Sequence, residues 1–284
     1  MFNLLKTTKI SFPGLGIGEF EVDSVAIPGN FPIAWYAIII TLGMILCVAY
    51  IMWRAKGIGI SSDEILDFAL FVIPIGIIGA RLYYVFSEID RYNSLGEVFN
   101  IRSGGLAIYG GIIAGAITVF VICKVKKIYF PAFADCVVPG LILAQAIGRW
   151  GNFMNGEAYG YETDIFIRMG LDFGWGVKYF HPTFLYESLW NILGFVLINI
   201  YFKHKKYDGQ IFLMVFGWYG LGRMFIEGLR TDSLYFNLFG NAFRTSQVLA
   251  GILFVICTAA LIYFAIKKPK SDFYYRIKPK KKEK

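Results

Sequence analysis

The sequence predicts an all-α integral membrane protein, a bundle of seven transmembrane helices with its amino terminus outside and its carboxy terminus in the cytoplasm. The 284 residues are 57% hydrophobic and 17% charged, whereas soluble domains are about 45–50% apolar and about 25% charged. Seven apolar runs are each about 17–25 residues long, which suffices to cross a hydrocarbon core about 30 Å thick. Lysine and arginine collect on one side of these runs. The solvent for most of the chain is therefore lipid.

The seven runs are expected to be helices, because a helix satisfies its backbone hydrogen bonds internally, as lipid requires. They are residues 33–53, 66–87, 104–123, 131–150, 182–202, 211–228 and 246–266. We expect residues 1–266 to form a single transmembrane domain. Residues 151–181 are the longest polar connection between runs, so they should form a small head outside the membrane.

The cations predict the orientation. With the amino terminus outside, the cation-rich segments fall in the cytoplasm, where short loops rich in lysine and arginine remain. These segments are residues 54–56, 124–127, 203–206 and 267–284. An odd number of spans places the carboxy terminus on the same side, so the assignment is self-consistent. The last segment is expected to be a basic cytoplasmic tail that contacts water and anionic membrane lipid.

Composition argues against several other classes of protein. The formal net charge is +8, but its cations are not clustered on a polar domain, so no nucleic-acid partner is expected. The histidines, His181 and His204, have no ligand-type neighbours at helical spacing, so neither a metal site nor a cofactor is expected. The four cysteines fall in or beside apolar runs and should pack as small hydrophobic side chains. They are Cys47, Cys123, Cys136 and Cys257.

Three arginines lie within the predicted spans. An ionisable side chain inside a span costs about 2.5–3.5 kcal/mol on insertion scales, so each one needs a partner or a function. Arg81, Arg149 and Arg223 all lie toward the ends of spans that run from inside to outside. We therefore expect all three in the outer half of the membrane.

Carboxylates and amides follow two of these arginines. Glu227 follows Arg223 at the i,i+4 spacing that faces it on a helix, and a plain salt bridge explains that pair as well as a functional role does. Two asparagines and a glutamate follow Arg149 within the glycine-rich residues 148–157, where the chain leaves the membrane. That concentration of hydrogen-bonding groups favours ligand binding at Arg149.

Aromatic and imidazole groups are expected at the same depth. Tyr36 begins the first span, Tyr109 lies near the start of the third, and His181 precedes the fifth. Tyr36 could equally be an interfacial belt residue, and Gly111 with Gly115 most simply forms a helix contact. Several guanidinium groups near the outer leaflet suit an anionic phosphate headgroup, which arginine can bind with two parallel hydrogen bonds.

Residues 148–157, Gly-Arg-Trp-Gly-Asn-Phe-Met-Asn-Gly-Glu, resemble the signature of the prolipoprotein diacylglyceryl transferases. Five further stretches resemble that family in the same order, so that the resemblance covers nearly the whole chain. They are residues 35–36, 79–81, 104–111, 181–187 and 222–227, the last followed by Arg230.

The resemblance implies an enzyme of the bacterial plasma or inner membrane whose catalytic domain is residues 1–266. Its substrates would be phosphatidylglycerol and prolipoprotein signal peptides with a lipobox cysteine. The diacylglyceryl group would pass from the lipid to the thiol of that cysteine, releasing glycerol phosphate. Many members have histidine where this chain has Tyr109, and an unperturbed tyrosine is mostly protonated near neutral pH, so the identity of the base stays open.

The resemblance and the charges together predict the site residues. The catalytic set is expected to be Arg149, Arg223, Tyr109 and Glu157. The residues expected to bind the substrate are Arg149, Asn152, Asn155, Tyr36, Arg81, Glu227 and His181. Within this set, the two arginines that stabilise the departing phosphate are expected to be Arg149 and Arg223, because the phosphate gains charge as its bond to carbon breaks.

Two other classes of membrane protein compete with this interpretation. A lipid or anion transporter also lines its path with buried arginines, but it should place polar groups along both halves of the membrane. The inner halves of these spans are nearly devoid of charge, which favours a site open to one leaflet. A seven-helix receptor permits an external amino terminus, yet it does not need phosphate-binding arginines beside a glycine-rich helix exit.

Overall fold

The structure is a computed structural model that describes residues 7–267, except 93, 101–103, 173, 175, 234 and 239–240. Most of the predicted basic tail, residues 268–284, lies outside the described residues. The chain divides into two compact units. Within the described part, unit 1 is residues 48–133, and unit 2 is residues 7–47 together with 134–267. Each unit is described by itself.

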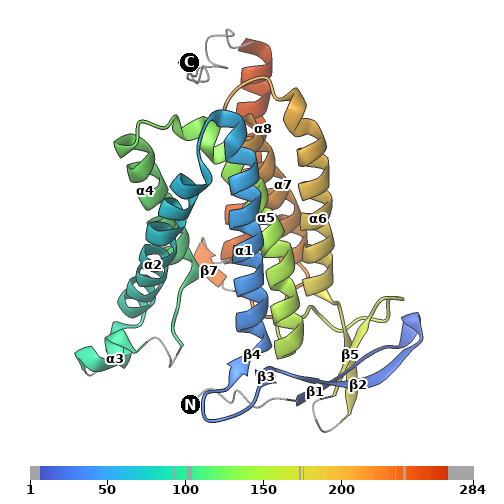
Figure 1. The fold of residues 1–284 in the computed structure, drawn as a ribbon. Coiled ribbons are helices and arrows are strands. Elements are labelled where there is room, and N and C mark those ends of the chain that lie inside the picture. Colours follow the sequence, from blue (N-terminus) through green and yellow to red (C-terminus); the bar gives the residue numbers. More distant parts are fainter. Residues whose placement is uncertain are drawn as a thin grey trace. The chain divides into compact units, whose positions relative to one another are not determined.

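Unit 1 is built around two apolar helices that pack side by side (Figure 1). Its elements are the end of α1 (Trp35–Ala55), η2 (Lys56–Ile58), α2 (Ser62–Ser87), η3 (Ile89–Arg91), α3 (Leu95–Phe99) and α4 (Ile108–Val125). Glycines allow α2 and α4 to approach closely, because a Cβ at Gly79 would lie only 2.8 Å from the carbonyl oxygen of Gly110. Gly111 and Gly115 also face α2, where a Cβ would make ordinary contacts of 3.4 Å with the carbonyl oxygen of Gly76 and 3.7 Å with Val72, so the predicted helix contact is confirmed.

Unit 2 contains the first part of α1 and four further helices (Figure 1). They are α5 (Phe130–Asn155, which begins in unit 1), α6 (Thr183–Tyr201), α7 (Gln210–Glu227) and α8 (Thr245–Lys267), with η5 (Phe202–His204) after α6. Buried aliphatic side chains of α5, α6 and α7 form one core. Its buried members are Val138, Ile142, Ile198, Ile211 and Val215. Apolar packing therefore joins the three helices where α6 ends and α7 begins.

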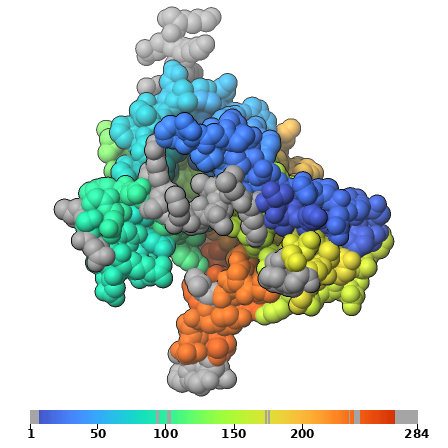
Figure 2. Space-filling model, turned by 90° about the horizontal axis from the view of Figure 1, so that it is seen from below, coloured from blue at the N-terminus to red at the C-terminus, as the bar shows by residue number. Residues whose placement is uncertain are grey.

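A four-stranded antiparallel sheet covers one end of the unit 2 helices, and the blue and yellow strands lie beside each other in Figure 2. Its order is β2-β1-β5-β6, from β1 (Thr7–Phe12), β2 (Ile17–Asp23), β5 (Met169–Asp172) and β6 (Val177–Phe180). Two short hairpins complete the unit: β3 (Val25–Ile27) with β4 (Ile33–Ala34), and β7 (Tyr235–Leu238) with β8 (Asn241–Arg244). The register pairs Ile10 with Leu171, and both side chains are buried in the core beneath the sheet.

The all-α prediction needs a correction, since the structure is mostly helical with a β-sheet head. Half of that sheet comes from β1 and β2, near the amino terminus, for which no strand was predicted. Strands this short depend on their partner, and the partner of β1 is β5, far along the chain. The local pattern alone was therefore too weak to indicate them.

Six helices in the described part of the chain are long and apolar enough to cross a membrane. They are Trp35–Ile58, Ser62–Ser87, Ile108–Val125, Phe130–Asn155, Thr183–His204 and Thr245–Lys267. The other run predicted to span is α7, which is not among the six and carries Arg223 and Glu227. The protein is thus an integral membrane protein with at least six membrane-length helices among the residues described.

Candidate functional site

Three helices of unit 2 bring ionisable side chains together near the end that carries the sheet (Figure 1). Arg149 lies in the last two turns of α5, Glu187 in the first turns of α6, and Arg223 in the last turns of α7. The end of α5 is fixed to the head, because Phe153 packs against the core that contains Phe12. The three side chains therefore lie near the same end of the unit 2 helices.

Glu187 is the centre of this cluster. Its Oε1 lies 2.5 Å from Nη2 of Arg149, and its Oε2 lies 3.0 Å from Nη1 of Arg223. Gln145 donates a further hydrogen bond of 3.2 Å to Oε1. The Glu187 side chain is only 4% exposed, and a buried charge is tolerable only when it is paired and hydrogen-bonded. One carboxylate therefore holds two arginines from two different helices.

The pair predicted at i,i+4 on α7 is also formed. Nη2 of Arg223 lies 2.5 Å from Oε2 of Glu227, whose side chain is 2% exposed. Two guanidinium groups and two carboxylates thus balance one another. One donor of Arg149 is unpaired, because its buried Nε–H has no acceptor among the described residues. The Arg149 side chain as a whole is 18% exposed, so parts of it other than this nitrogen remain accessible.

The residues after Arg149 form the hydrogen-bonded group that their sequence suggested. Nη1 of Arg149 donates to Oδ1 of Asn152 at 3.1 Å. The amides of Asn152 and Asn155 both donate to Oε1 of Glu157, at 2.9 Å and 3.1 Å. Gly156 makes this possible, since its φ of +60° turns the chain back immediately after α5. The structure therefore brings these four predicted residues into one network.

Tyr36 packs against α5 beside this network. A Cβ at Gly151 would lie 2.8 Å from Cδ2 of the Tyr36 ring, so glycine is what lets the ring approach the helix. About two turns further along α1, a Cβ at Gly43 would lie 3.2 Å from the carbonyl oxygen of Ala144. The first part of α1 therefore lies directly on α5, and it holds the Tyr36 ring against the α5 face that carries Gly148 and Gly151.

His181 lies on the connection between the head and α6. Its Nδ1 is 3.2 Å from the hydroxyl of Tyr186, and its carbonyl oxygen accepts a hydrogen bond from Gly160 N. Burial lowers the pKa of His181 below its ordinary value, so the imidazole is neutral at pH 7. His181 is thereby tied to the loop that follows Glu157, next to the network at the end of α5.

Arg81 and Tyr109, the other two predicted site residues, belong to unit 1. Arg81 is 5% exposed and uses all three guanidinium nitrogens on backbone carbonyls. These bonds are Nε to Val98 at 2.7 Å, Nη1 to Gly104 at 2.6 Å and to Gly105 at 3.0 Å, and Nη2 to Glu97 at 2.7 Å. Arg81 therefore organises the loop before α4, where Tyr109 is the second residue. Contact of either residue with substrate stays a prediction.

Glu187 was not among the predicted site residues, although the sequence contained a signal for it. It is an ionisable residue inside a predicted span, and the cost argument applied to the arginines applies to it equally. Asn191, one turn further along α6, is another polar residue in that span. It is fully buried, and neither of its amide atoms has a hydrogen-bond partner among the described residues.

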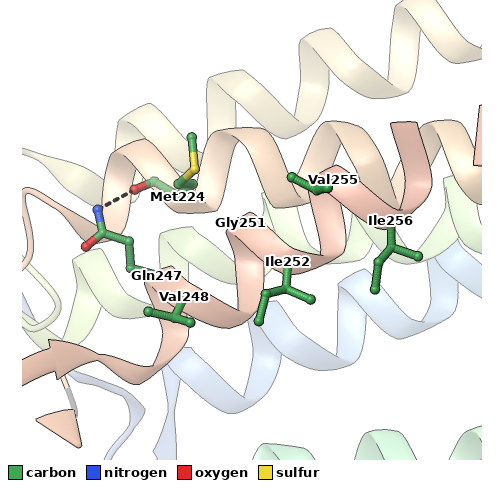
Figure 3. A pocket seen from close by; sticks show the side chains of 7 residues that line it. All are labelled: Met224, Gln247, Val248, Gly251, Ile252, Val255 and Ile256. Atoms are coloured by element: carbon green, nitrogen blue, oxygen red, sulfur yellow. Dashed lines mark hydrogen bonds between the residues drawn. The ribbon is translucent and has the colours of Figure 1, made fainter. Parts of the chain in front are cut away.

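A separate groove of about 520 Å³ runs between α7 and α8. Met224 and Gln247 lie at one end, where the Gln247 amide donates to the Met224 carbonyl at 2.9 Å, and aliphatic residues within 248–256 of α8 line the rest (Figure 3). The lining carries no charged side chain. The groove therefore offers no charged side chain to an anionic group.

Buried arginines paired with carboxylates at one end of a membrane helix bundle are typical of a membrane protein with a functional site inside the bundle. Comparison with known proteins makes this class specific. The sequence profile of the family described as "Prolipoprotein diacylglyceryl transferase" matches residues 24–263. The chain belongs to this family.

Curated relatives are similar to the chain over most of its length. A protein of Listeria welshimeri is 44% identical over 264 residues, which are 89% of this chain and 94% of the relative. A protein of Finegoldia magna is 48% identical over 244 residues, 84% of this chain and 94% of the relative. Both are named "Phosphatidylglycerol--prolipoprotein diacylglyceryl transferase". A Clostridium perfringens relative, 44% identical over 87% of this chain and 96% of its own length, has that name with the number 1.

Proposed function

We propose that this chain transfers the diacylglyceryl group of phosphatidylglycerol to the thiol of a lipobox cysteine in bacterial prolipoproteins, the first step of lipoprotein maturation. Family membership and the names of relatives at 43–48% identity support the reaction. The membrane-length helices support a multi-pass protein of the bacterial plasma or inner membrane. The single observation that carries the proposal is the cluster in which Glu187 holds Arg149 and Arg223 together.

The chemistry explains why two arginines are needed. The cysteine sulfur attacks the glyceryl carbon, a carbon–sulfur bond forms, and the carbon–oxygen bond to the phosphate breaks. Glycerol phosphate leaves with that electron pair, so negative charge grows on the phosphate during the step. Guanidinium groups beside it stabilise the transition state more than the ground state, which is the requirement for catalysis. The Nε–H of Arg149 has no partner among the described residues, and the phosphate could accept from it once neighbouring side chains move to expose it.

The thiol must also lose its proton, because a free cysteine is mostly protonated at pH 7. Glu157 is one candidate acceptor, and the amides of Asn152 and Asn155 orient its carboxylate. Tyr109 stands where many family members have histidine, and it could accept the proton only as a phenolate. Asn152, Asn155, Tyr36 and Glu227 then surround the headgroup, with His181 and Arg81 as the remaining proposed contacts.

We extend the proposal to topology. Residues 1–266 form one catalytic domain with seven spans, of which α7 is the one beyond the six membrane-length helices. The amino terminus and the sheet lie outside, and the basic tail lies in the cytoplasm. Glu227 and Arg223 are tolerable within a span because they neutralise each other at 2.5 Å.

A direct transfer assay tests the function. Purified protein in phosphatidylglycerol-containing micelles is incubated with a synthetic lipobox peptide, and the mass of the peptide is then measured by mass spectrometry. A mass gain equal to one diacylglyceryl unit is expected, with none on a matched peptide whose cysteine is serine. If the cysteine peptide gains no mass while the protein, reconstituted into vesicles, moves labelled lipid between leaflets, the chain is a transporter and the proposal is wrong.

A further inference from the structure

Helices α6 and α7 meet through a reciprocal pair of tryptophans. The rings of Trp190 and Trp218 stack with centroids 4.3 Å apart and planes 16° apart. Nε1 of Trp190 donates to the carbonyl oxygen of Trp218 at 3.0 Å, and Nε1 of Trp218 donates to the carbonyl oxygen of Trp190 at 2.9 Å. Both indole N–H groups are thus satisfied within the span, where water is absent and an unpaired donor would be costly.

Two glycines leave the space that these rings occupy. A Cβ at Gly194 would overlap Nε1 of Trp218, and a Cβ at Gly222 would overlap Nε1 of Trp190. Each glycine follows the tryptophan of its own helix in a Trp-x-x-x-Gly pattern, which reads Trp-Asn-Ile-Leu-Gly on α6 and Trp-Tyr-Gly-Leu-Gly on α7. The two antiparallel helices therefore present the same pattern to each other.

This arrangement admits one register. Sliding α6 along α7 by a single residue moves it about 1.5 Å, which lengthens and bends both indole hydrogen bonds and so weakens them. The same movement shifts each ring away from the glycine that makes room for it. The tryptophan pair is therefore a discrete lock and not a continuously adjustable contact.

The lock lies next to the charged cluster. Glu187 precedes Trp190 by one helical turn, and Arg223 directly follows Gly222. The 3.0 Å contact between Oε2 of Glu187 and Nη1 of Arg223 crosses the same interface as the stacked rings. We infer that Trp190 and Trp218 are positioning residues, which hold α6 and α7 in the register where Glu187 reaches Arg149 and Arg223 together. This inference rests on the proposed function of those two arginines.

A double-mutant cycle in the full-length protein tests the inference. Gly222→Ala should lower kcat for diacylglyceryl transfer by about ten- to a hundred-fold, because displacements near 1 Å can cost that much. KM for phosphatidylglycerol should change less. Trp190→Leu should also lower kcat, but adding Gly222→Ala to it should have no further effect, since the ring that the methyl group strikes is gone.

Gly217→Ala is the matched control, because it lies on the same helix and its Cβ would meet only Cβ of Cys257, at an ordinary 3.5 Å. Its kcat and melting temperature should equal those of the wild type. Trp190→Phe adds no atoms and removes only the donor and part of the stack, so it should fold and still lower kcat several-fold. Gly194→Ala should reproduce Gly222→Ala from the other helix.

Melting temperature in detergent separates positioning from simple stability. A purely structural role lowers the melting temperature while the folded fraction keeps wild-type kcat, and that result would overturn the inference. So would wild-type turnover in Trp190→Phe, or equal effects of Gly222→Ala with and without Trp190. If Arg149 variants retain full turnover, the proposed roles of the arginines fail. If those variants are inactive but Gly222→Ala and Trp190→Phe are not, the lock alone fails.

Discussion

At the scale of residues, we predict that Arg149 acts by donating two parallel hydrogen bonds from its guanidinium group to the lipid phosphate. Arg149→Lys keeps the charge but cannot make two parallel hydrogen bonds, so it should lower turnover by about 100-fold or more. Arg149→Gln should be worse. The melting temperature of the lysine variant in detergent should stay near that of the wild type, because an ammonium can still pair with Glu187.

Arg168→Lys is the matched control for Arg149. Arg168 lies in the head, where it donates to the backbone carbonyl groups of Asp164 and Ile165, and its replacement should leave turnover unchanged. Wild-type turnover in Arg149→Lys would contradict the need for two parallel hydrogen bonds from Arg149. Loss of folding in both Arg149 variants would instead assign the side chain to stability.

Glu187 is predicted to matter for both stability and turnover. Glu187→Gln keeps the shape but removes the charge that lies between Arg149 and Arg223. Breaking a buried ion pair from one side costs about 3–5 kcal/mol, so the melting temperature and the transfer rate should both fall. Glu162→Gln is the control, because its pair with Lys178 is exposed and such pairs contribute about 0–1 kcal/mol. Equal melting temperatures for the two variants would contradict the central role of Glu187.

His181 predicts a specific pH dependence of stability. Because burial holds its pKa below the ordinary value near 6.5, the folded protein binds fewer protons there than the unfolded chain does. Its contribution is fully present above pH 6.5 and declines as the pH falls through the folded pKa. Asp232, whose pKa is lowered by its hydrogen bond from Arg230, titrates below this window. Melting temperature should therefore drop more between about pH 7.5 and about pH 5.5 in the wild type than in His181→Asn, and equal drops would contradict the assignment.

These residues show which contacts of the site could be predicted from the sequence. The group around Arg149 was predictable because Asn152, Asn155 and Glu157 are near neighbours in the chain. Glu187 lies on a different helix, and nothing local in the sequence indicates which arginine it binds. The hydrogen bonds of Arg81 to the backbone before α4 could not be predicted from the sequence either, because they depend on how the loop folds back.

At the scale of elements, Asp135 is predicted to anchor the start of α7. It is fully buried on α5 and accepts hydrogen bonds from the backbone N–H groups of Gly209, at 2.9 Å, and Phe212, at 2.8 Å. Lys205 lies 3.2 Å from the same carboxylate. The first N–H groups of a helix have no partner within it, so Asp135 supplies from another helix what a capping residue usually supplies locally.

Asp135→Ala leaves those donors buried and unpaired, which should destabilise the protein by about 3–5 kcal/mol. The matched control is Asp67→Ala, because Asp67 pairs with Lys126 at an exposed position and should contribute about 0–1 kcal/mol. Thermal unfolding in detergent measures both. An Asp135→Ala variant as stable as Asp67→Ala would show that α7 does not need the anchor.

The elements themselves were predicted unevenly. Long apolar runs identified each membrane-length helix to within a few residues, since twenty apolar residues in lipid have almost no alternative to a helix. The β1–β5 pairing and the capping of α7 by Asp135 join residues far apart in the sequence. Periodicity reports only what one segment does by itself, so neither could be found from it.

At the scale of the whole molecule, unit 2 has two chemically different ends. The sheet and the charged cluster lie at the end where α5 and α7 finish and where α6 and α8 begin (Figure 1). The opposite end carries Lys203, Lys205 and Lys206 in the short connection to α7, and Lys267 at the end of α8. Short basic connections remain in the cytoplasm, so the sheet end is predicted to lie outside.

Cysteine labelling and a reporter test this orientation. The four native cysteines are all buried, so they should react little with a membrane-impermeant maleimide. Glu19→Cys, at an exposed position of β2, should react in intact cells, whereas Lys206→Cys, also exposed, should react only after the cells are broken. A reporter fused after Lys284 should read as cytoplasmic. Reaction of Lys206→Cys in intact cells would contradict the outer position of the site. A periplasmic or surface reading of the reporter, with Glu19→Cys also reactive in intact cells, would contradict the seven-span count, because an even number of spans would place the two ends of the chain on one side.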